Sequence, residues 1–337
     1  MIRTLLFTIC AAGLLAAQNR PLDIYWIDVE GGAATLIVAP SGQSLLVDAG
    51  NPGNDDRDPK RIAAVAQMAG LKKIDMLLTT HFHGDHVGGT PALSKMIPVD
   101  RYFDHGDSIE TTPAAVQLFN AYKAVAEGKR TTVKPGDRIP LRGVTVEVVS
   151  ANGAVLDKPI NGGGPNPFCA GAKPHDPDKT ENQRSAGFLL TYGKFKFLDL
   201  GDLTWDKEME LACPADKLGT VTLLQATHHG FVNDFSGAPA LYWALKPQVV
   251  VVNDGPRKGL QVSAWETIHQ IQGLQGVWQS HLALATDSQH NTDERQIANL
   301  EPTDQCKGNW LKASISRDGK VTVTNGRNGY SQTYAAR

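Results

Sequence analysis

Residues 79–86 of this chain read Thr79-Thr80-His81-Phe82-His83-Gly84-Asp85-His86. They follow residues 74–78, an apolar run that is typical of a buried strand. Three imidazoles and one carboxylate within six residues are the ligand types that zinc and similar divalent metals prefer. A polar loop with coincidental histidines is the alternative, and this density of ligands makes it the weaker one. The stretch therefore predicts a metal site at the end of a strand.

The spacing within this motif indicates two metal positions. Alternate side chains of an extended segment point the same way, so His81 and His83 can reach one metal together. Gly84 is expected to allow a tight turn, because glycine adopts backbone angles that other residues avoid. That turn would aim Asp85 and His86 at a second metal.

A second set of polar residues follows apolar segments in the C-terminal half. Asp202 comes after a predicted strand at 195–198, where its carboxylate could bridge two metals, although a helix N-cap is the structural alternative. His228 and His229 follow another predicted strand, at 221–225. One of these two histidines is expected to bind metal and the other to face the substrate or support the ligands. Asp48 is expected to orient a ligand histidine through its second ring nitrogen.

The two halves of the chain resemble each other in these places. Val47-Asp48-Ala49-Gly50 is similar to Leu198-Asp199-Leu200-Gly201, and both follow strand-like segments. The approach to His81 is likewise similar to the approach to His228. Two β-rich halves that each deliver ligands from strand ends indicate a single pseudo-duplicated domain.

With these residues in place, the chain resembles the metallo-β-lactamase superfamily. Within that superfamily it is most similar to the hydrolase domain of the competence (DNA-uptake channel) proteins and to their secreted relatives. The resemblance implies an α/β fold, namely a four-layer αββα sandwich with a dinuclear metal site at the edge between two sheets. The matching stretches are Asp28–Ala33, Leu45–Gly50, Thr80–Gly89, Asn182–Ser185, Leu198–Asp202 and His228–Gly230.

The resemblance also implies roles for individual residues. His81 and His83 would bind the first metal, and Asp202 would bridge the two metals. Asp85, His86 and either His228 or His229 would serve the second metal. Asp85 and His229 are the expected catalytic residues.

One departure from the superfamily concerns the first metal. Most members supply a further histidine some two dozen residues before the bridging aspartate. This chain has Asn182 and Ser185 in that region, as the competence-type branch does, and the nearby histidine is His175. Either His175 completes the first metal site from its loop, or that site has fewer ligands and binds metal weakly.

The composition excludes several other classes of protein. Hydrophobic residues make up 41% and charged residues 20%, which rules out disorder. The net charge of -2 gives no strong nucleic-acid-binding signal. Neither a Gly-x-Ser-x-Gly elbow nor a phosphate-binding glycine loop occurs in the sequence.

The N-terminus predicts export. Residues 1–17 combine one cation, an apolar run and terminal small residues, as a signal peptide does. We expect a secreted or periplasmic protein with no membrane span after signal removal. The remaining 18–337 would form one domain with a C-terminal extension from about 260. In an exported chain one pair among Cys169, Cys213 and Cys306 could be oxidised, and the sequence leaves open which.

The sequence thus predicts a secreted hydrolase with two divalent metal ions, zinc first and manganese as the alternative. A metal-bound hydroxide would attack the substrate. The resemblance to the competence-type branch favours a phosphodiester, and this substrate would be small or short because the chain is not basic. A lactone or amide hydrolase, an iron oxidoreductase and a non-catalytic metal-binding surface protein remain alternatives. The oligomeric state stays open.

Overall fold

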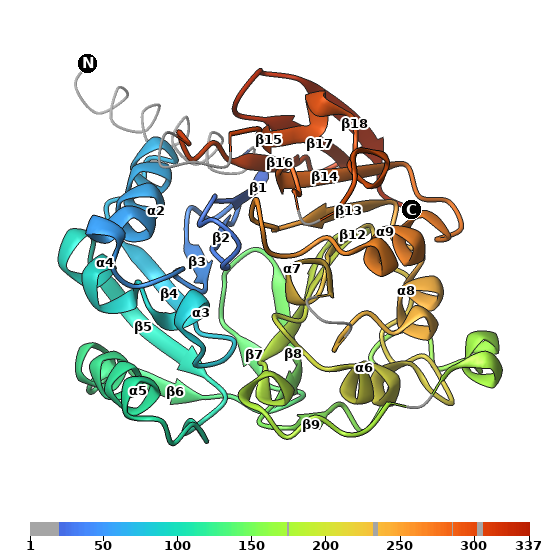
Figure 1. Ribbon diagram of the computed structural model, residues 1–337, viewed down its shortest axis with the longest axis horizontal. Coiled ribbons are helices and arrows are strands. Elements are labelled where there is room, and N and C mark those ends of the chain that lie inside the picture. The colour runs from blue at the N-terminus through green and yellow to red at the C-terminus, as the bar shows by residue number, and fades with distance from the viewer. Residues whose placement is uncertain (1–19, 174, 232–234, 285, 302–305) are drawn as a thin grey trace, which may run out of the picture.

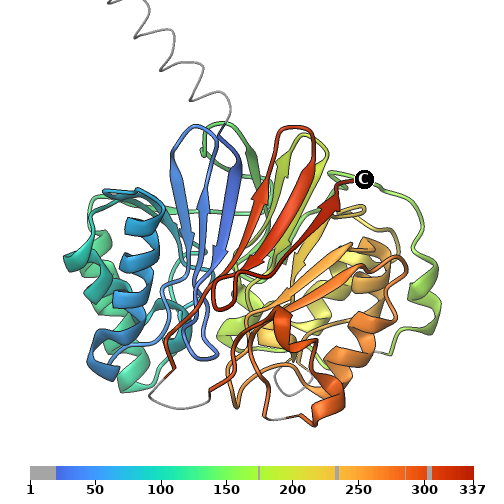
Figure 2. The ribbon, with the colours of Figure 1, turned by 90° about the horizontal axis from the view of Figure 1, so that it is seen from above.

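Two sheets of nine strands each lie face to face, and helices cover their outer faces (Figures 1 and 2). This computed structural model describes residues 20–173, 175–231, 235–284, 286–301 and 306–337, so the expected signal peptide at 1–17 lies outside the described residues. The four layers of helix, sheet, sheet and helix are the predicted αββα sandwich.

The first sheet has the strand order β18-β17-β16-β1-β2-β3-β4-β5-β6. Its strands β3, β4, β5 and β6 run parallel, and the pairs from β18 through β3 are antiparallel. The strands are β1 (Leu22–Trp26), β2 (Thr35–Val38), β3 (Ser44–Val47), β4 (Ile74–Leu78), β5 (Val99–Asp104), β6 (Arg130–Thr132), β16 (Leu311–Ile315), β17 (Lys320–Asn325) and β18 (Ser331–Ala335).

The second sheet has the order β15-β14-β13-β12-β11-β10-β8-β7, with β9 paired to β8. Strands β11 through β15 run parallel. The strands are β7 (Arg138–Ile139), β8 (Thr145–Ala151), β9 (Ala154–Val155), β10 (Gly187–Tyr192), β11 (Phe195–Asp199), β12 (Leu223–Gln225), β13 (Val249–Val252), β14 (Gly276–His281) and β15 (Ile297–Asn299).

The helices lie on the outer faces, α2, α4 and α5 against the first sheet and α6, α8 and α9 against the second (Figure 2). Two short helices, α3 and α7, carry residues of the predicted metal site. The α-helices are α2 (Arg57–Met68), α3 (Gly84–Val87), α4 (Thr90–Met96), α5 (Pro113–Ala126), α6 (Trp205–Ala212), α7 (His228–Phe231), α8 (Pro239–Leu245) and α9 (Val262–His269). The 3-10 helices are η1 (Asn54–Asp56), η2 (Pro167–Gly171), η3 (Glu181–Arg184), η5 (Ser288–His290) and η6 (Glu294–Gln296).

Burial on both faces explains why the central strands are continuously apolar. In β3, Leu45 and Val47 pack between the two sheets, whereas Leu46 packs under the helices of the first sheet. Successive side chains of a strand point to opposite faces, so a sheet covered on both sides needs apolar residues at every position.

The segment after residue 260 contributes strands to both sheets. Strands β14 and β15 extend the second sheet, and β16 joins the first sheet beside β1. Asp318 and Gly319 lie in the connection between β16 and β17, which pair as an antiparallel hairpin. The C-terminal part of the chain therefore helps to close the sandwich over its apolar core.

Candidate metal centre

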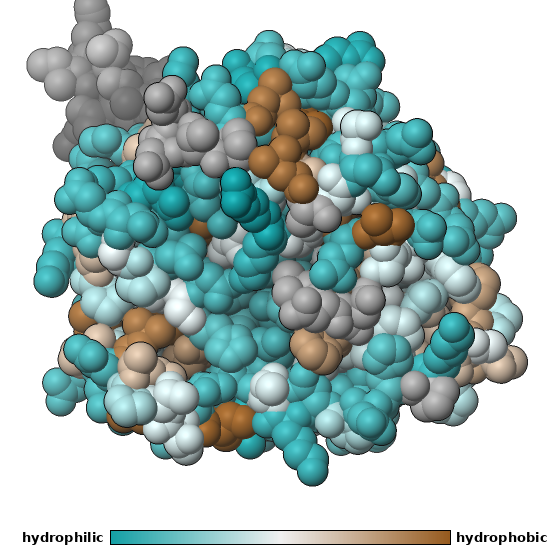
Figure 3. All heavy atoms as spheres, viewed as in Figure 1, coloured by the Kyte–Doolittle hydropathy of each residue, from teal (hydrophilic) through white to brown (hydrophobic). Residues whose placement is uncertain are grey.

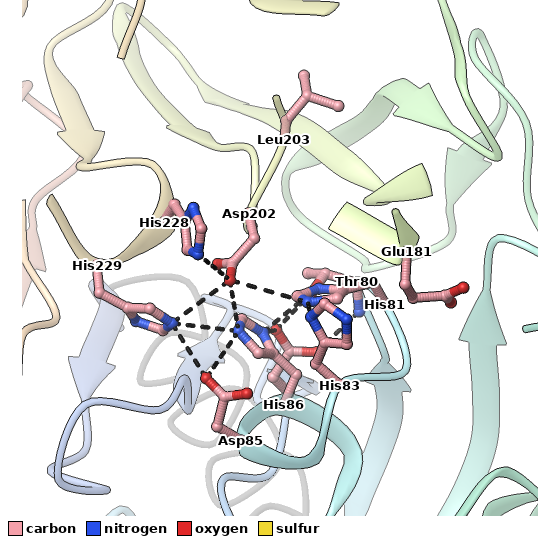
Figure 4. Close-up of polar contacts among 12 residues, drawn as sticks. Thr80, His81, His83, Asp85, His86, Glu181, Asp202, Leu203, His228 and His229 are labelled. Atoms are coloured by element: carbon pink, nitrogen blue, oxygen red, sulfur yellow. Dashed lines mark hydrogen bonds and ion pairs between the residues drawn. The ribbon is translucent and has the colours of Figure 1, made fainter. Parts of the chain in front are cut away.

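The predicted ligands meet where parallel strands of both sheets end (Figure 4). Asp48 follows β3 and the 79–86 motif follows β4, while Asp202 follows β11 and the two histidines follow β12. The carboxyl ends of parallel strands lie at one edge of a sheet, which is where α/β folds place their sites. The sandwich brings the edges of both sheets together.

Asp48 orients His86. Its Oδ2 lies 2.7 Å from Nδ1 of His86 and also accepts a hydrogen bond from Thr80 Oγ1 at 2.7 Å. Its Oδ1 accepts from the Thr80 backbone amide at 2.8 Å. Because Nδ1 of His86 donates to a carboxylate, the lone pair of Nε2 can bind a cation. The predicted contact between Asp48 and a histidine of the motif is present.

His81 and His83 point at a common position. Nε2 of His81 lies 3.1 Å from Nδ1 of His83. The other nitrogen of each ring is also engaged: Nδ1 of His81 lies 3.1 Å from Thr80 Oγ1, and Nε2 of His83 lies 3.5 Å from Oε1 of Glu110. Glu110 was not predicted from the sequence, where nothing links it to the motif.

Asp202 lies among the imidazoles and is almost fully buried. Its Oδ2 lies close to histidines from both groups of predicted ligands. The distances from this oxygen to Nε2 are 3.8 Å for His81, 3.2 Å for His86, 3.4 Å for His228 and 3.6 Å for His229. A carboxylate with nitrogen ligands around it is arranged as a bridging ligand would be.

His229 also approaches Asp85, with Nε2 lying 3.3 Å from Oδ2. Its Nδ1 contacts the side-chain amide of Asn253 at 3.2 Å, whereas Nδ1 of His228 contacts Ser236 Oγ at 3.5 Å. One ligand atom from each of Asp85, His86, Asp202 and His229 lies within 4.8 Å of the others. This geometry favours His229 over His228 for the second metal.

The backbone at His228 and His229 adopts left-handed angles, with φ of 51° and 58°. These angles are uncommon for residues with side chains and concentrate at functional sites. Hydrogen bonds hold the segment in place: the His228 amide donates to Gly201 O at 3.0 Å, and the Leu260 amide donates to His229 O at 2.9 Å.

The ionisable groups at the centre shift one another's pKa values. Burial opposes ionisation of Asp202, but the surrounding imidazoles, His86 first, hold its pKa well below the usual range. Burial likewise opposes the charged form of His86, yet Asp202 and Asp48 keep its pKa well above the usual range. The Lys258 ammonium contacts Oδ2 of Asp85 and adds a further positive charge. Lys258, like Asn253, was not predicted, because both lie far from the motif in sequence.

The ligand set fits divalent metal ions. Among the described residues at the centre, each imidazole has its outer nitrogen engaged. The inner nitrogens face Asp202, except that of His83, which faces His81. Neutral imidazoles and carboxylates suit zinc, and oriented outer nitrogens are the usual support for such ligands. His81, His83 and Asp202 would hold one ion, and Asp85, His86, His229 and Asp202 would hold the other.

His175 lies elsewhere. It is exposed, and its ring stacks on the indole of Trp205 with 4.1 Å between centroids and 18° between planes. The structure therefore gives His175 a stacking contact in place of a position among the converging nitrogens. Asn182 is buried on η3, and Ser185 directly follows that helix.

A buried pair that was not predicted, Glu181 and His105, supports the 79–86 motif, hereafter the metal-binding loop. Oε1 of Glu181 lies 2.8 Å from Nε2 of His105 and accepts from the Phe82 backbone amide at 3.3 Å. Oε2 of the same residue accepts from the Ile109 amide at 3.0 Å. Glu181 thereby anchors the backbone between the two histidines of the first pair.

The expectation about Gly84 is wrong in its detail. Gly84 is the first residue of α3 and has no left-handed φ, so the chain turns by starting a helix. Asp85 and His86 reach the centre from that helix.

Of the cysteines, Cys169 and Cys213 form a disulfide, and Cys306 is free.

Comparisons with known proteins agree with this geometry. The family model of the metallo-beta-lactamase superfamily matches residues 27–179. A metal-dependent hydrolase of Cupriavidus necator is 29% identical over 140 residues, which are 42% of this chain and 45% of that protein. One of Thermodesulfovibrio yellowstonii is 26% identical over 186 residues, 51% of this chain and 63% of that protein. The chain thus spans less than half of the Cupriavidus relative and under two thirds of the other.

Among solved structures, the metallo-beta-lactamase fold protein YhfI of Bacillus subtilis is 13% identical, with a TM-score of 0.47 over 77% of this chain and 96% of that chain. Over residues 27–179, and in its two-sheet fold with the metal-ligand motif, the chain is similar to the metallo-beta-lactamase superfamily.

Proposed function

We propose that this protein is a secreted metal-dependent hydrolase that cleaves phosphodiester bonds. The observation that carries the proposal is the convergence of Nε2 of His81, His86, His228 and His229 on Oδ2 of Asp202, with His83 beside His81. Divalent metal ions held there would supply an activated water and polarise the scissile bond. Zinc is the proposed metal, with manganese as the alternative.

The residues of the chain divide the remaining tasks. Asp48, Glu110 and Asn253 fix the rings of the ligands, so the positions of the donor atoms are set before any metal binds. Asp85 and His229 face each other at the centre and are the proposed catalytic pair. Such prior positioning is what makes electrostatic stabilisation of a transition state effective.

Lys258 favours a phosphodiester over an uncharged substrate. Its ammonium lies at the centre, and its side chain is 35% exposed, so it can also reach an incoming group. A phosphodiester carries a negative oxygen that such a charge would hold. Since the whole chain has a net charge of only -2, this local charge is the feature that would favour an anion.

The disulfide between Cys169 and Cys213 supports the proposal of secretion, because such bonds persist in oxidising compartments. None of the described helices combines the length and hydropathy that a membrane span requires. Cell fractionation of the full chain would test this part. Recovery of the protein in the cytoplasm, with both thiols reduced, would contradict it.

The experiment that tests the activity joins metal analysis to a substrate panel. Metal content is measured on purified protein, and turnover is measured with bis-(p-nitrophenyl) phosphate, a lactone and a cephalosporin. Two equivalents of zinc or manganese with phosphodiester turnover are expected. Turnover of the lactone or cephalosporin alone would establish the carbonyl-directed alternative. Bound iron with redox absorbance would contradict hydrolysis, and protein without metal would favour a binding role.

A further inference from the structure

An apolar groove of about 860 Å³ opens beside the metal-binding loop. It lies between the α3–α4 segment and helix α5, and the start of α2 closes its side. Its walls include Pro52, Ala92, Met96, Leu118 and Ala121. Figure 3 shows brown, apolar side chains gathered on this part of the face, in the same view in which Figure 1 shows α3, α4 and α5. Binding metal ions at the centre does not by itself require such a groove.

The groove adjoins the metal centre at His83. Phe82, His83 and Gly84 line its inner end, and His83 is also one of the predicted ligands. The side chain of His83 is 33% exposed, so one ring faces the groove and the centre together. The two features therefore share a wall.

Gly84 keeps the inner end open. A methyl group added at this position would lie 3.9 Å from Leu118 Cδ2 and 3.9 Å from Pro52 Cδ, which is ordinary contact distance. With hydrogen there instead, a gap remains between these two side chains. An occupant of the groove can thus approach the backbone of the metal-binding loop.

We propose that this groove binds an uncharged alkyl or aryl group of the substrate, attached to the group that reacts at the metal centre. The inference rests on the proposed function and specifies its substrate class, a phosphodiester with an apolar ester group. The volume lies within the range of about 300–1,000 Å³ that is typical of small-molecule sites. The acids Asp56 and Glu110 line the groove with one base, Lys95, so a second anionic group would be disfavoured.

A chain-length series tests the groove. Methyl-, butyl- and octylphosphonate resist hydrolysis and carry the same anionic head, so isothermal titration of the zinc-loaded protein measures the contribution of the alkyl chain. Burial of each methylene should tighten binding about fourfold until the groove is filled. Inorganic phosphate serves as the reference without a chain. Equal affinity across the series would overturn the proposal.

Substitutions in the groove wall test whether the dependence on chain length arises there. Leu118→Asp places a charge on the groove wall, and Ala121→Trp fills the space from the same helix. Both should abolish the dependence on chain length while phosphate binding stays within about twofold. Val116→Asp is the matched control, because Val116 is on α5, is 42% exposed and does not line the groove. Circular dichroism and thermal melts check folding, and Ala121→Trp carries the test if Leu118→Asp unfolds.

The two proposals fail in different ways. If phosphate and all phosphonates fail to bind, the proposed metal centre is wrong. Saturation-transfer NMR with 1-hexanol, which carries no head group, then still tests the groove. A hexanol signal that Ala121→Trp removes would support the groove, and its absence would overturn it. Phosphodiester turnover with no chain-length dependence leaves the hydrolase intact and refutes the groove.

Discussion

Oδ2 of Asp48 lies 2.7 Å from Nδ1 of His86, and both residues are almost fully buried. The contact joins the end of β3 to helix α3 and sets which nitrogen of His86 faces the centre. Asp48 has a φ of 60°, a left-handed angle that aspartate and asparagine tolerate better than most residues. Asp48 thus combines a left-handed backbone with the orientation of a predicted metal ligand.

Replacing Asp48 by Asn should weaken zinc binding about 10- to 100-fold, because the supporting carboxylate of a ligand histidine is lost. Asparagine keeps the left-handed backbone, so the fold should be retained. Competition with a chromophoric chelator measures the affinity. An unchanged zinc affinity would show that Asp48 is only structural.

Replacing Asp85 by Ala should abolish phosphodiester turnover with little loss of folding. Asp85 is partly exposed and contacts His86, His229 and Lys258 at the centre, outside the apolar core. Turnover by the purified variant, together with its thermal melting temperature, checks both parts. Retained turnover would overturn the assignment of the catalytic site.

Replacing Lys258 by Met should raise zinc affinity and lower phosphodiester turnover. The ammonium now contacts Asp85, so it competes with a metal for that carboxylate. The same charge would be missing when an anionic substrate binds. Arg257→Met removes an equal charge from the exposed neighbouring residue and serves as the control. A matching rise in zinc affinity in both variants would indicate a general charge effect and contradict a specific role for Lys258.

Replacing Glu208 by Gln should flatten the pH dependence of stability. Glu208 is buried, accepts the backbone amides of Gly237 at 2.6 Å and Ala238 at 2.7 Å, and burial raises its pKa from 4.5 to about 8. Between these values the folded protein keeps a proton that the unfolded chain loses, so the free energy of unfolding falls as pH rises.

The amide oxygen of glutamine can accept the same two hydrogen bonds without titrating. Urea unfolding at pH 5, 6.5 and 8 therefore should give a weaker decline with pH in the variant. The exposed residue Glu266, replaced by Gln, is the matched control. An equal decline in wild type and Glu208→Gln would assign the pH dependence to other groups.

Reducing the disulfide should destabilise the protein by roughly 2–4 kcal/mol, as expected for a bond that closes a loop of moderate length. Cys169 and Cys213 are 44 residues apart in sequence. Urea unfolding of the Cys169→Ser/Cys213→Ser variant measures the change. The Cys306→Ser variant, which removes the free thiol, separates the disulfide from the loss of a cysteine as such.

The sequence by itself determined the fold class and most of the residues that meet at the centre. Residues 79–86 are contiguous, follow a strand that is buried on both faces and contain the ligand types that metals need. The order of residues along the chain is therefore enough to identify these candidate ligands. The same is true of Asp202 and of the paired histidines after β12. Apolar runs such as Leu45–Val47 showed which strands are covered on both sides.

Only the tertiary structure decided which distant residues support these ligands. Asn253 reaches His229 across 24 residues, and Lys258 reaches Asp85 across 173. The stacking of His175 on Trp205 and the pairing of Cys169 with Cys213 are likewise contacts between separate segments. The physical reason is that hydrogen bonds, ion pairs and disulfides depend on distances in space, which the order of residues does not give until the sheets have packed.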